Sequence, residues 1–406
     1  MVPPILDVFV VWHPEDAAGE LVAAQFLEHF HGSAFSGLIG GAIEVYVRSQ
    51  GWRDARDAPR PLSPGAYEIN GAGMTAIVPV LGVGFADAVE SGEGPWLEYA
   101  RQVAELRHAD PNSVGVFPVR LSEGATNGTK LGELFGSIQS IGPQAGAPTA
   151  ETAAARCRDL AQGIAQLANG QSRLKVFISH TKRGAAGEVE QLARLITQVR
   201  SAIDGTRLAE YFDASDLQPG ADWIADLDAN ARASALLAVR TDLYASREWC
   251  QREVASAKLA GMPVVILDAL SDGEERGSFL MDHVARVPAA SARDELNDAA
   301  IVVALNRLVD ESLKRELWER QRQVTAGGAE WSIAWWAPHA PEPLTLASWL
   351  TDEIAELPRD ADVRVLHPDP PLGPVERDAL EQIADLTGLA KRLDVMTPRG
   401  LAARGG

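Results

Sequence analysis

The chain alternates short apolar runs with longer segments in which apolar residues recur at helical spacing. The runs include VFVV from residue 8, TAIVPVL from residue 75, VFIS from residue 176 and VVIL from residue 264. After the third run, one helix face is outlined by Val189, Leu192, Leu195, Ile196, Val199 and Ile203. Short buried strands that alternate with amphipathic helices are typical of a parallel sheet covered on both faces. The sequence therefore predicts an α/β protein.

Two stretches of the chain begin alike, which indicates an internal duplication. VFVVWHPEDAAGE (8–20) and VFISHTKRGAAGE (176–188) align without a gap, and each precedes a helical pattern. Further along, the apolar run at 74–85 corresponds to the run at 233–244. Similar segments in the same order predict two α/β modules in tandem.

Loop-forming sequences and a change of pattern near the C-terminus divide the chain into four segments. The expected segments are a first α/β domain at 1–145, a linker helix at 146–172, a second α/β domain at 173–295, and a long helix with a small α/β region at 296–406. Thr149 is the expected N-cap of the linker helix, which runs through Ala168. The long helix covers 296–323, and four tryptophans follow it, Trp331, Trp335, Trp336 and Trp349.

Charge and cysteine content narrow the choice of partners. The 406 residues carry a formal net charge of -19, so the average surface repels a phosphate backbone and nucleic acid is not an expected partner. Cys157 and Cys250 are the only cysteines, which gives neither a disulfide framework nor a metal-type cysteine pair. The N-terminus lacks a basic signal-peptide region, and no apolar run reaches the roughly 20 residues of a membrane span. We expect a cytoplasmic protein without a membrane segment or metal site.

A predicted helix at 246–260, SREWCQREVASAKLA, places a carboxylate among apolar residues. Ser246 is its expected N-cap. Glu253 follows Trp249 by four residues, Cys250 by three and Ser246 by seven, so the four side chains are expected to share one stripe of the helix. Because burial of an unpaired charge is costly, Glu253 needs either a partner or a function.

Three segments of the second domain are expected to meet at one edge of its sheet. They are the loop after Ser179, the loop YFDASDLQPGADW (211–223) with Asp216 and Trp223, and the helix start at Ser246. In an open parallel sheet, the loops after the carboxyl ends of the strands line the ligand crevice. These residues are therefore candidates for a single site.

Residues 173–290 resemble a Toll/interleukin-1 receptor (TIR) domain of the bacterial type. The resemblance rests on KVFISH (175–180), DLQPGADW (216–223) and above all SREWCQRE (246–253), which is similar to the family's Ser-x-x-Trp-Cys-x-x-Glu motif. It implies a flavodoxin-like fold and, where the helix glutamate is kept, cleavage of NAD at the nicotinamide-ribose bond. The sequence departs from many bacterial members in the loop after the first strand, which reads TKRG where they carry an acidic residue.

The resemblance implies an NAD nucleosidase, a glycosidic bond hydrolase that takes NAD as substrate and needs no cofactor. Glu253 falls on the catalytic position, where a carboxylate would stabilise the charge that develops on the ribose. The expected products are nicotinamide and ADP-ribose or a cyclic form of it. The expected substrate-binding residues are Phe177, Ser179, His180, Asp216, Trp223, Ser246, Trp249 and Cys250, of which Trp249 and Cys250 mainly fix the helix.

The same resemblance implies a biological role and a mode of control. It points to a bacterial anti-phage defence effector that an unidentified ligand or protein activates. Activation would proceed through homotypic self-association, which can be filamentous. In the first domain, SGEGPWLEYARQ (91–102) stands where the second has SREWCQRE, and Ala100 follows Trp96 by four residues. We therefore expect that domain to be a divergent, non-catalytic TIR-like module.

Two alternatives stay open at the level of the sequence. The first is a non-catalytic TIR signalling or scaffold module, because domains of this family also act as adaptors. The second is a nucleoside deoxyribosyltransferase-like enzyme, which uses a similar sheet and a glutamate nucleophile. A nucleoside substrate in place of a dinucleotide would distinguish the second alternative.

Overall fold

The computed structural model of the 406-residue chain forms two compact units. It describes residues 5–32, 35, 45–50, 72–92, 94–142, 149–181, 188–206, 208, 210–212, 230–274, 276–289, 297–326, 333–357, 362–389 and 392–404. Unit 1 comprises Met1–Ser172 with Glu316–Thr325, and unit 2 comprises Arg173–Arg315 with Ala326–Gly406. Each unit is described by itself below.

Unit 1 is built on a parallel sheet with the strand order β2-β1-β3-β4, and a fifth strand, β5, continues along β3. The strands are β1 (Leu6–Val11), β2 (Val45–Gln50), β3 (Met74–Leu81), β4 (Val114–Val116) and β5 (Val119–Arg120). β1 and β3 are buried along their whole length, as their continuous apolar runs predict. Pro118, which has no N–H to donate, stands between β4 and β5.

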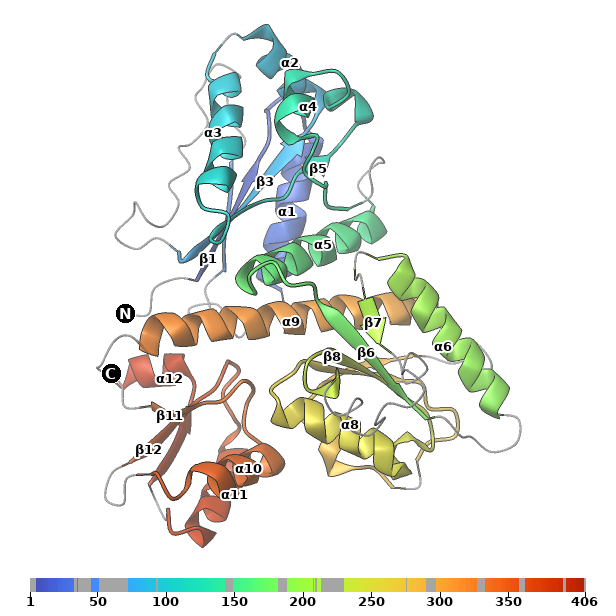
Figure 1. The fold of residues 1–406 in the computed structure, drawn as a ribbon, viewed down its shortest axis with the longest axis vertical. Helices are drawn as coiled ribbons and strands as arrows, with labels where there is room; N and C mark the ends of the chain where they lie inside the picture. The colour runs from blue at the N-terminus through green and yellow to red at the C-terminus, as the bar shows by residue number, and fades with distance from the viewer. Residues whose placement is uncertain are drawn as a thin grey trace, which may run out of the picture. The chain divides into compact units, whose positions relative to one another are not determined.

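The helices of unit 1 are α1 (Ala18–Phe30), α2 (Val83–Ser91), α3 (Trp96–Ala109), α4 (Lys130–Phe135) and α5 (Ala150–Ala168), with a 3₁₀ turn η3 (Glu123–Ala125). α2, α3 and α4 pack together over one core that includes Phe85, Trp96 and Tyr99, and α1 packs against α5 (Figure 1). The strand order reverses direction at β1 and β3, so right-handed crossovers place these two groups of helices on opposite faces of the sheet.

α5 corrects one expectation of the sequence and confirms another. Its N-cap is Thr149, whose side chain accepts a hydrogen bond from the backbone N–H of Thr152, and the helix ends at Ala168 as predicted. It is nevertheless not a linker, because it buries Leu160 and Ile164 completely and packs on α1 and β4 within unit 1. An amphipathic helix of this length gains more by covering a sheet than by bridging solvent.

Unit 2 contains a five-stranded parallel sheet with the order β10-β9-β8-β6-β7. Its strands are β6 (Lys175–His180), β7 (Glu210–Phe212), β8 (Ala235–Arg240), β9 (Val264–Asp268) and β10 (Ala285–Pro288). The helical segments around it are α6 (Glu188–Asp204), the 3₁₀ turn η5 (Tyr244–Ser246), α8 (Glu248–Leu259) and the 3₁₀ turn η6 (Phe279–Met281). Counted along this segment, the strand order is 2-1-3-4-5, the flavodoxin-like order, and the four strands β2-β1-β3-β4 of unit 1 follow the same rule.

The end of the chain adds a small parallel sheet, β11-β12-β13, to unit 2. Its elements are β11 (Ile333–Trp336), α10 (Pro343–Glu353), β12 (Val363–Leu366), α11 (Pro374–Leu386), β13 (Leu393–Met396) and α12 (Pro398–Ala403), in agreement with the pattern of the sequence. We call residues 333–404 the C-terminal lobe. Proline stands at the first turn of both α10 and α11, where its missing N–H costs nothing.

The long helix predicted at 296–323 is α9 (Asp298–Ala326). Its last part, Glu316–Thr325, is counted with unit 1, and the part up to Arg315 with unit 2, so the segment 296–406 does not form a unit of its own. Within the described ranges, no helix combines the length and the apolar character that crossing a membrane requires.

Candidate active site

The strand order of the unit 2 sheet reverses between two neighbouring strands, β6 and β8. The two strands lie side by side, with Ser179 opposite Ala238 and His180 opposite Val239. The chain leaves β6 towards β7 and leaves β8 towards β9, in opposite directions across the sheet. Such a reversal creates a crevice at the carboxyl ends of the strands, where ligands of open α/β sheets bind.

Glu253 reaches this edge from α8. Its Oε2 accepts a hydrogen bond from Ser179 Oγ at 2.5 Å, although the two residues are 74 positions apart in the chain. The glutamate is 9% exposed and Ser179 is 1% exposed. A short hydrogen bond from a hydroxyl to a carboxylate stabilises the ionised form of the acid. The charge that the sequence places among apolar residues therefore has a partner.

Tyr244, in the turn η5, completes a chain of three groups. Its Oη lies 2.5 Å from Ser179 Oγ. Because the single hydrogen of Ser179 is donated to Glu253, the Tyr244 hydroxyl is the donor to Ser179. Burial, with smaller contributions from Cys250 and Glu253, raises the pKa of the Tyr244 phenol well above its usual value. The phenol thus keeps the proton that it donates.

The loops behind this edge are fixed by charged groups. Arg240, at the end of β8, donates to Glu274 Oε1 at 3.0 Å and to Asp268 Oδ1 at 3.0 Å. The pKa of Arg240 is raised, chiefly by its hydrogen bonds with Glu274. Asp242 accepts from the three successive backbone N–H groups of residues 271–273. The segments after β8 and β9 are therefore tied together beneath the start of α8.

Ser246 does not cap α8, contrary to the expectation from the sequence. It belongs to η5, and its exposed hydroxyl donates to the Leu243 carbonyl at 2.8 Å. Arg247 is the N-cap residue, and its side chain makes no capping bond. Gln251 instead holds the beginning of the helix, because its side-chain amide donates to the Ala245 carbonyl at 2.6 Å. Ser246 therefore does not share the stripe of Glu253.

The other predicted site residues fall into three groups. Phe177 and Cys250 are buried in the hydrophobic core under α8, so Phe177 packs the core and does not line an open pocket. His180 lies partly exposed at the end of β6, with its Nδ1 3.0 Å from the Thr181 carbonyl. Trp249 is half-buried, and the guanidinium of Arg252 lies 4.9 Å from its ring centroid. Asp216 and Trp223 lie outside the described residues.

Sequence reasoning missed Tyr244. Its signal was present, because an aromatic residue stands four positions after the end of β8 and two positions before the SREWCQRE motif. What the sequence could not show is that the turn η5 directs this hydroxyl at the end of β6. For Ser179 and Glu253, the sequence supported only a general expectation of proximity, because the carboxyl ends of neighbouring parallel strands lie at the same edge of a sheet.

The corresponding edge of unit 1 carries different groups. Asp16 places its carboxylate on the N-terminus of α2, where it accepts from the backbone N–H groups of Gly84 and Phe85, both at 2.9 Å. A helix N-terminus attracts anions, and here a side chain of the same unit already fills that position. Ala100 is completely buried on α3, four residues after Trp96, so this helix offers no carboxylate at that place.

Neither a family model nor a curated protein matches this chain. Among the described residues, histidine, cysteine, aspartate and glutamate form no group of three that could hold a metal ion.

Proposed function

We propose that unit 2 is a TIR-type NAD glycohydrolase with Glu253 as its catalytic carboxylate. The observation that carries the proposal is the position of this carboxylate, beside Ser179 at the reversal point of a flavodoxin-like sheet. The likeness of SREWCQRE to the TIR motif supports the same residue from the sequence. Perturbed or unusually placed ionisable groups at such an edge are a recognised sign of function.

One carboxylate is sufficient for this cleavage because NAD carries its own leaving group. The bond between the anomeric carbon of the ribose and the nicotinamide nitrogen breaks, and the electron pair stays on nicotinamide, which becomes neutral without a general acid. The ribose passes through an oxocarbenium-like state that a nearby carboxylate stabilises. Water then adds to the anomeric carbon and releases one proton, which gives ADP-ribose. Attack by a group of the substrate itself would give a cyclic product.

Ser179 and Tyr244 prepare Glu253 for this role. The donor bond from Ser179 orients the carboxylate, and Tyr244 fixes the orientation of the Ser179 hydroxyl. In the proposed complex, Glu253 engages the hydroxyls of the nicotinamide ribose. A charge set in place before substrate binds costs no reorganisation during the reaction.

The proposed role in the cell is that of a bacterial anti-phage defence effector that depletes NAD or makes a signal from it. An enzyme that destroys a central cofactor has to be inactive at rest. We propose self-association of the TIR-type module as the switch, in response to an unidentified ligand or protein. Unit 1, whose equivalent edge lacks the helix carboxylate, is assigned to assembly or regulation.

The test compares two glutamates of the same helix. Glu253→Gln keeps the shape and the hydrogen bond to Ser179 but removes the charge, and we expect NAD turnover to fall roughly 10²-fold or more. Glu248→Gln changes an exposed residue in the first turn of α8 and should retain turnover within about twofold.

Three other outcomes of these assays would each support a different conclusion about the function. Equal turnover by Glu253→Gln and wild type would overturn the assignment of Glu253. Release of bases from deoxynucleosides, without cleavage of NAD, would support the deoxyribosyltransferase-like alternative. Absence of both activities in assembled protein would support a scaffold role.

A further inference from the structure

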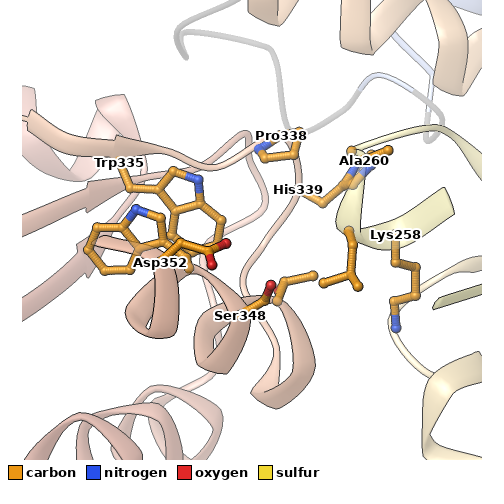
Figure 2. Close-up of a pocket in the computed structure, with 11 residues that line it drawn as sticks. Lys258, Ala260, Trp335, Pro338, His339, Ser348 and Asp352 are labelled. Atoms are coloured by element: carbon orange, nitrogen blue, oxygen red, sulfur yellow. The ribbon is translucent and has the colours of Figure 1, made fainter. Parts of the chain in front are cut away.

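A pocket of unit 2 lies at the C-terminal end of α8, and Glu253 is not among the residues that line it. It has a volume of about 230 Å³ and opens between residues 258–261 and the C-terminal lobe (Figure 2). The lobe contributes Trp335 from β11, Pro338 and His339 from the following loop, and Ser348, Trp349 and Asp352 from α10. The proposed function makes no use of this pocket.

Two stacked tryptophan side chains contribute to one wall of the pocket. Trp335 and Trp349 stack with their ring centroids 5.0 Å apart and their planes 8° from parallel. Both indoles are half-buried and rest on the hydrophobic core of the C-terminal lobe, which holds them in place. Rigid, partly exposed aromatic rings bind other planar rings by stacking, and nucleobases are the common case because every base has a π-face.

The positive charges at the pocket are already neutralised or absent. Lys258 is buried, and its Nζ lies 3.1 Å from Glu342 Oε1 and donates to the carbonyls of Leu280 and Asp282 at 3.1 and 3.0 Å. Figure 2 shows its side chain on the opposite side of the pocket from Trp335. Burial lowers the pKa of His339, so its ring is neutral at pH 7. A phosphate group would therefore find no free cation among the residues that line the pocket.

The charge that remains at the wall is negative. Asp352 is exposed on α10, and Figure 2 shows its carboxylate beside Trp335. A carboxylate next to stacked indoles accepts hydrogen bonds from N–H groups or faces a cationic ring. The volume also limits the ligand, because about 230 Å³ lies below the roughly 300–1,000 Å³ of sites for drug-sized molecules. A single ring system therefore suits the pocket better than a dinucleotide.

We propose that this pocket binds a planar nitrogen heterocycle of the nucleobase class, stacked on the Trp335–Trp349 pair with an amino group directed at Asp352. Such a ligand would contact the end of α8 and the beginning of the C-terminal lobe together. Because α8 also carries Glu253, five residues before Lys258, occupancy would bias the position of the helix. This coupling to catalysis rests on the proposed function, whereas the binding itself does not.

Calorimetric titration of the full chain with adenine and with cytosine tests the site. We expect saturable binding of at least one of these bases, with one site per chain, and roughly tenfold weaker binding by Asp352→Asn, which corresponds to about 1.4 kcal/mol. Glu353→Gln, the matched control, changes the exposed neighbour on α10 that does not line the pocket, and should bind as wild type does. Trp349→Leu should abolish binding.

Several binding results would contradict the proposed base-binding site. No saturable binding of either base at millimolar concentration, or unchanged affinity in Asp352→Asn, would overturn the proposal. Loss of binding in Glu253→Gln would place the base at the Glu253 edge and would overturn it as well. NAD turnover measured with and without the bound base then tests the coupling, so an inactive protein that still binds the base contradicts the proposed function alone.

Discussion

At the level of single residues, a hydroxyl group helps to stabilise the buried Glu253 carboxylate. A carboxylate that is 9% exposed has lost most of its water, and Ser179 replaces part of that hydration with a 2.5 Å hydrogen bond. Tyr244 then fixes the orientation of Ser179 from the turn η5. The same bonds that make the buried charge tolerable also set it at the sheet edge before any substrate arrives.

Ser179→Ala removes the donor of this chain and leaves the carboxylate less well satisfied. We expect the free energy of unfolding to fall by about 1–3 kcal/mol and NAD turnover to fall with it. Tyr244→Phe leaves Ser179 in place and should lower the free energy of unfolding by about 1 kcal/mol. Denaturant unfolding at pH 7 measures both changes. Ser246→Ala is the matched control, because its exposed hydroxyl bonds only the local Leu243 carbonyl, and a Ser179→Ala protein as stable as this control would contradict the account.

At the level of secondary-structure elements, α8 is held at both ends by its own side chains, which bond to groups outside the helix. Gln251 ties its first turn to the Ala245 carbonyl. Lys258 ties its last turn to Glu342, which precedes α10. The ion pair is buried, with side chains 6% and 4% exposed. The helix that carries Glu253 therefore depends on the C-terminal lobe for its position.

Lys258→Met should destabilise unit 2 by about 3–5 kcal/mol, because it leaves the Glu342 carboxylate buried without its cation. The double variant Lys258→Met with Glu342→Met should recover a large part of that loss, since it removes both charges. A double-mutant cycle from denaturant unfolding measures the coupling, and Lys175→Met, at an exposed position of β6, is the control. A coupling energy below about 0.5 kcal/mol would contradict the role assigned to the pair.

The elements were largely predictable from the sequence, whereas their contacts were not. Apolar runs predicted β1, β3, β6, β8 and β9, and the N-cap at Thr149 was confirmed with its helix end. The cap at Ser246 was wrong because a 3₁₀ turn, stabilised by long-range contacts, precedes α8. Phe177 was assigned to a pocket, but it is buried in the core under α8. The periodicity of apolar residues does not show which face of a buried strand packs against which helix.

At the scale of the whole molecule, the two flavodoxin-like sheets share the order of their first four strands but differ at the edge where ligands bind. Unit 2 presents Glu253, Ser179 and Tyr244 there, and unit 1 fills a helix N-terminus with Asp16. The likeness of residues 8–20 to 176–188 is in keeping with this common order. The difference in edge chemistry assigns the proposed reaction to unit 2.

The stability of the molecule should fall when the medium is made mildly acidic, in part through His367 at the end of β12. Its ring is completely buried, and burial lowers its pKa from 6.5 to about 4. The unfolded chain therefore takes up a proton at higher pH than the folded protein, so stability is complete above about pH 6.5 and declines towards pH 4. Between pH 7 and pH 5, the titration of His367 alone should lower the free energy of unfolding by about 2 kcal/mol.

His367→Asn removes the titration and keeps an N–H donor for the Pro368 carbonyl, which the ring contacts at 2.8 Å. Between pH 7 and pH 5, the free energy of unfolding should fall by about 2 kcal/mol less in the variant than in wild type, and denaturant unfolding at the two pH values measures the difference. Identical losses in the two proteins would contradict the assignment.

The proposed NAD cleavage at Glu253 is tested by product analysis of NAD incubated with the purified full chain over a wide range of protein concentration. We expect release of nicotinamide together with ADP-ribose or its cyclic form, with turnover per chain that rises steeply with concentration and is lost in Glu253→Gln. Nicotinamide release at the same rate by wild type and Glu253→Gln, at every concentration, would contradict it.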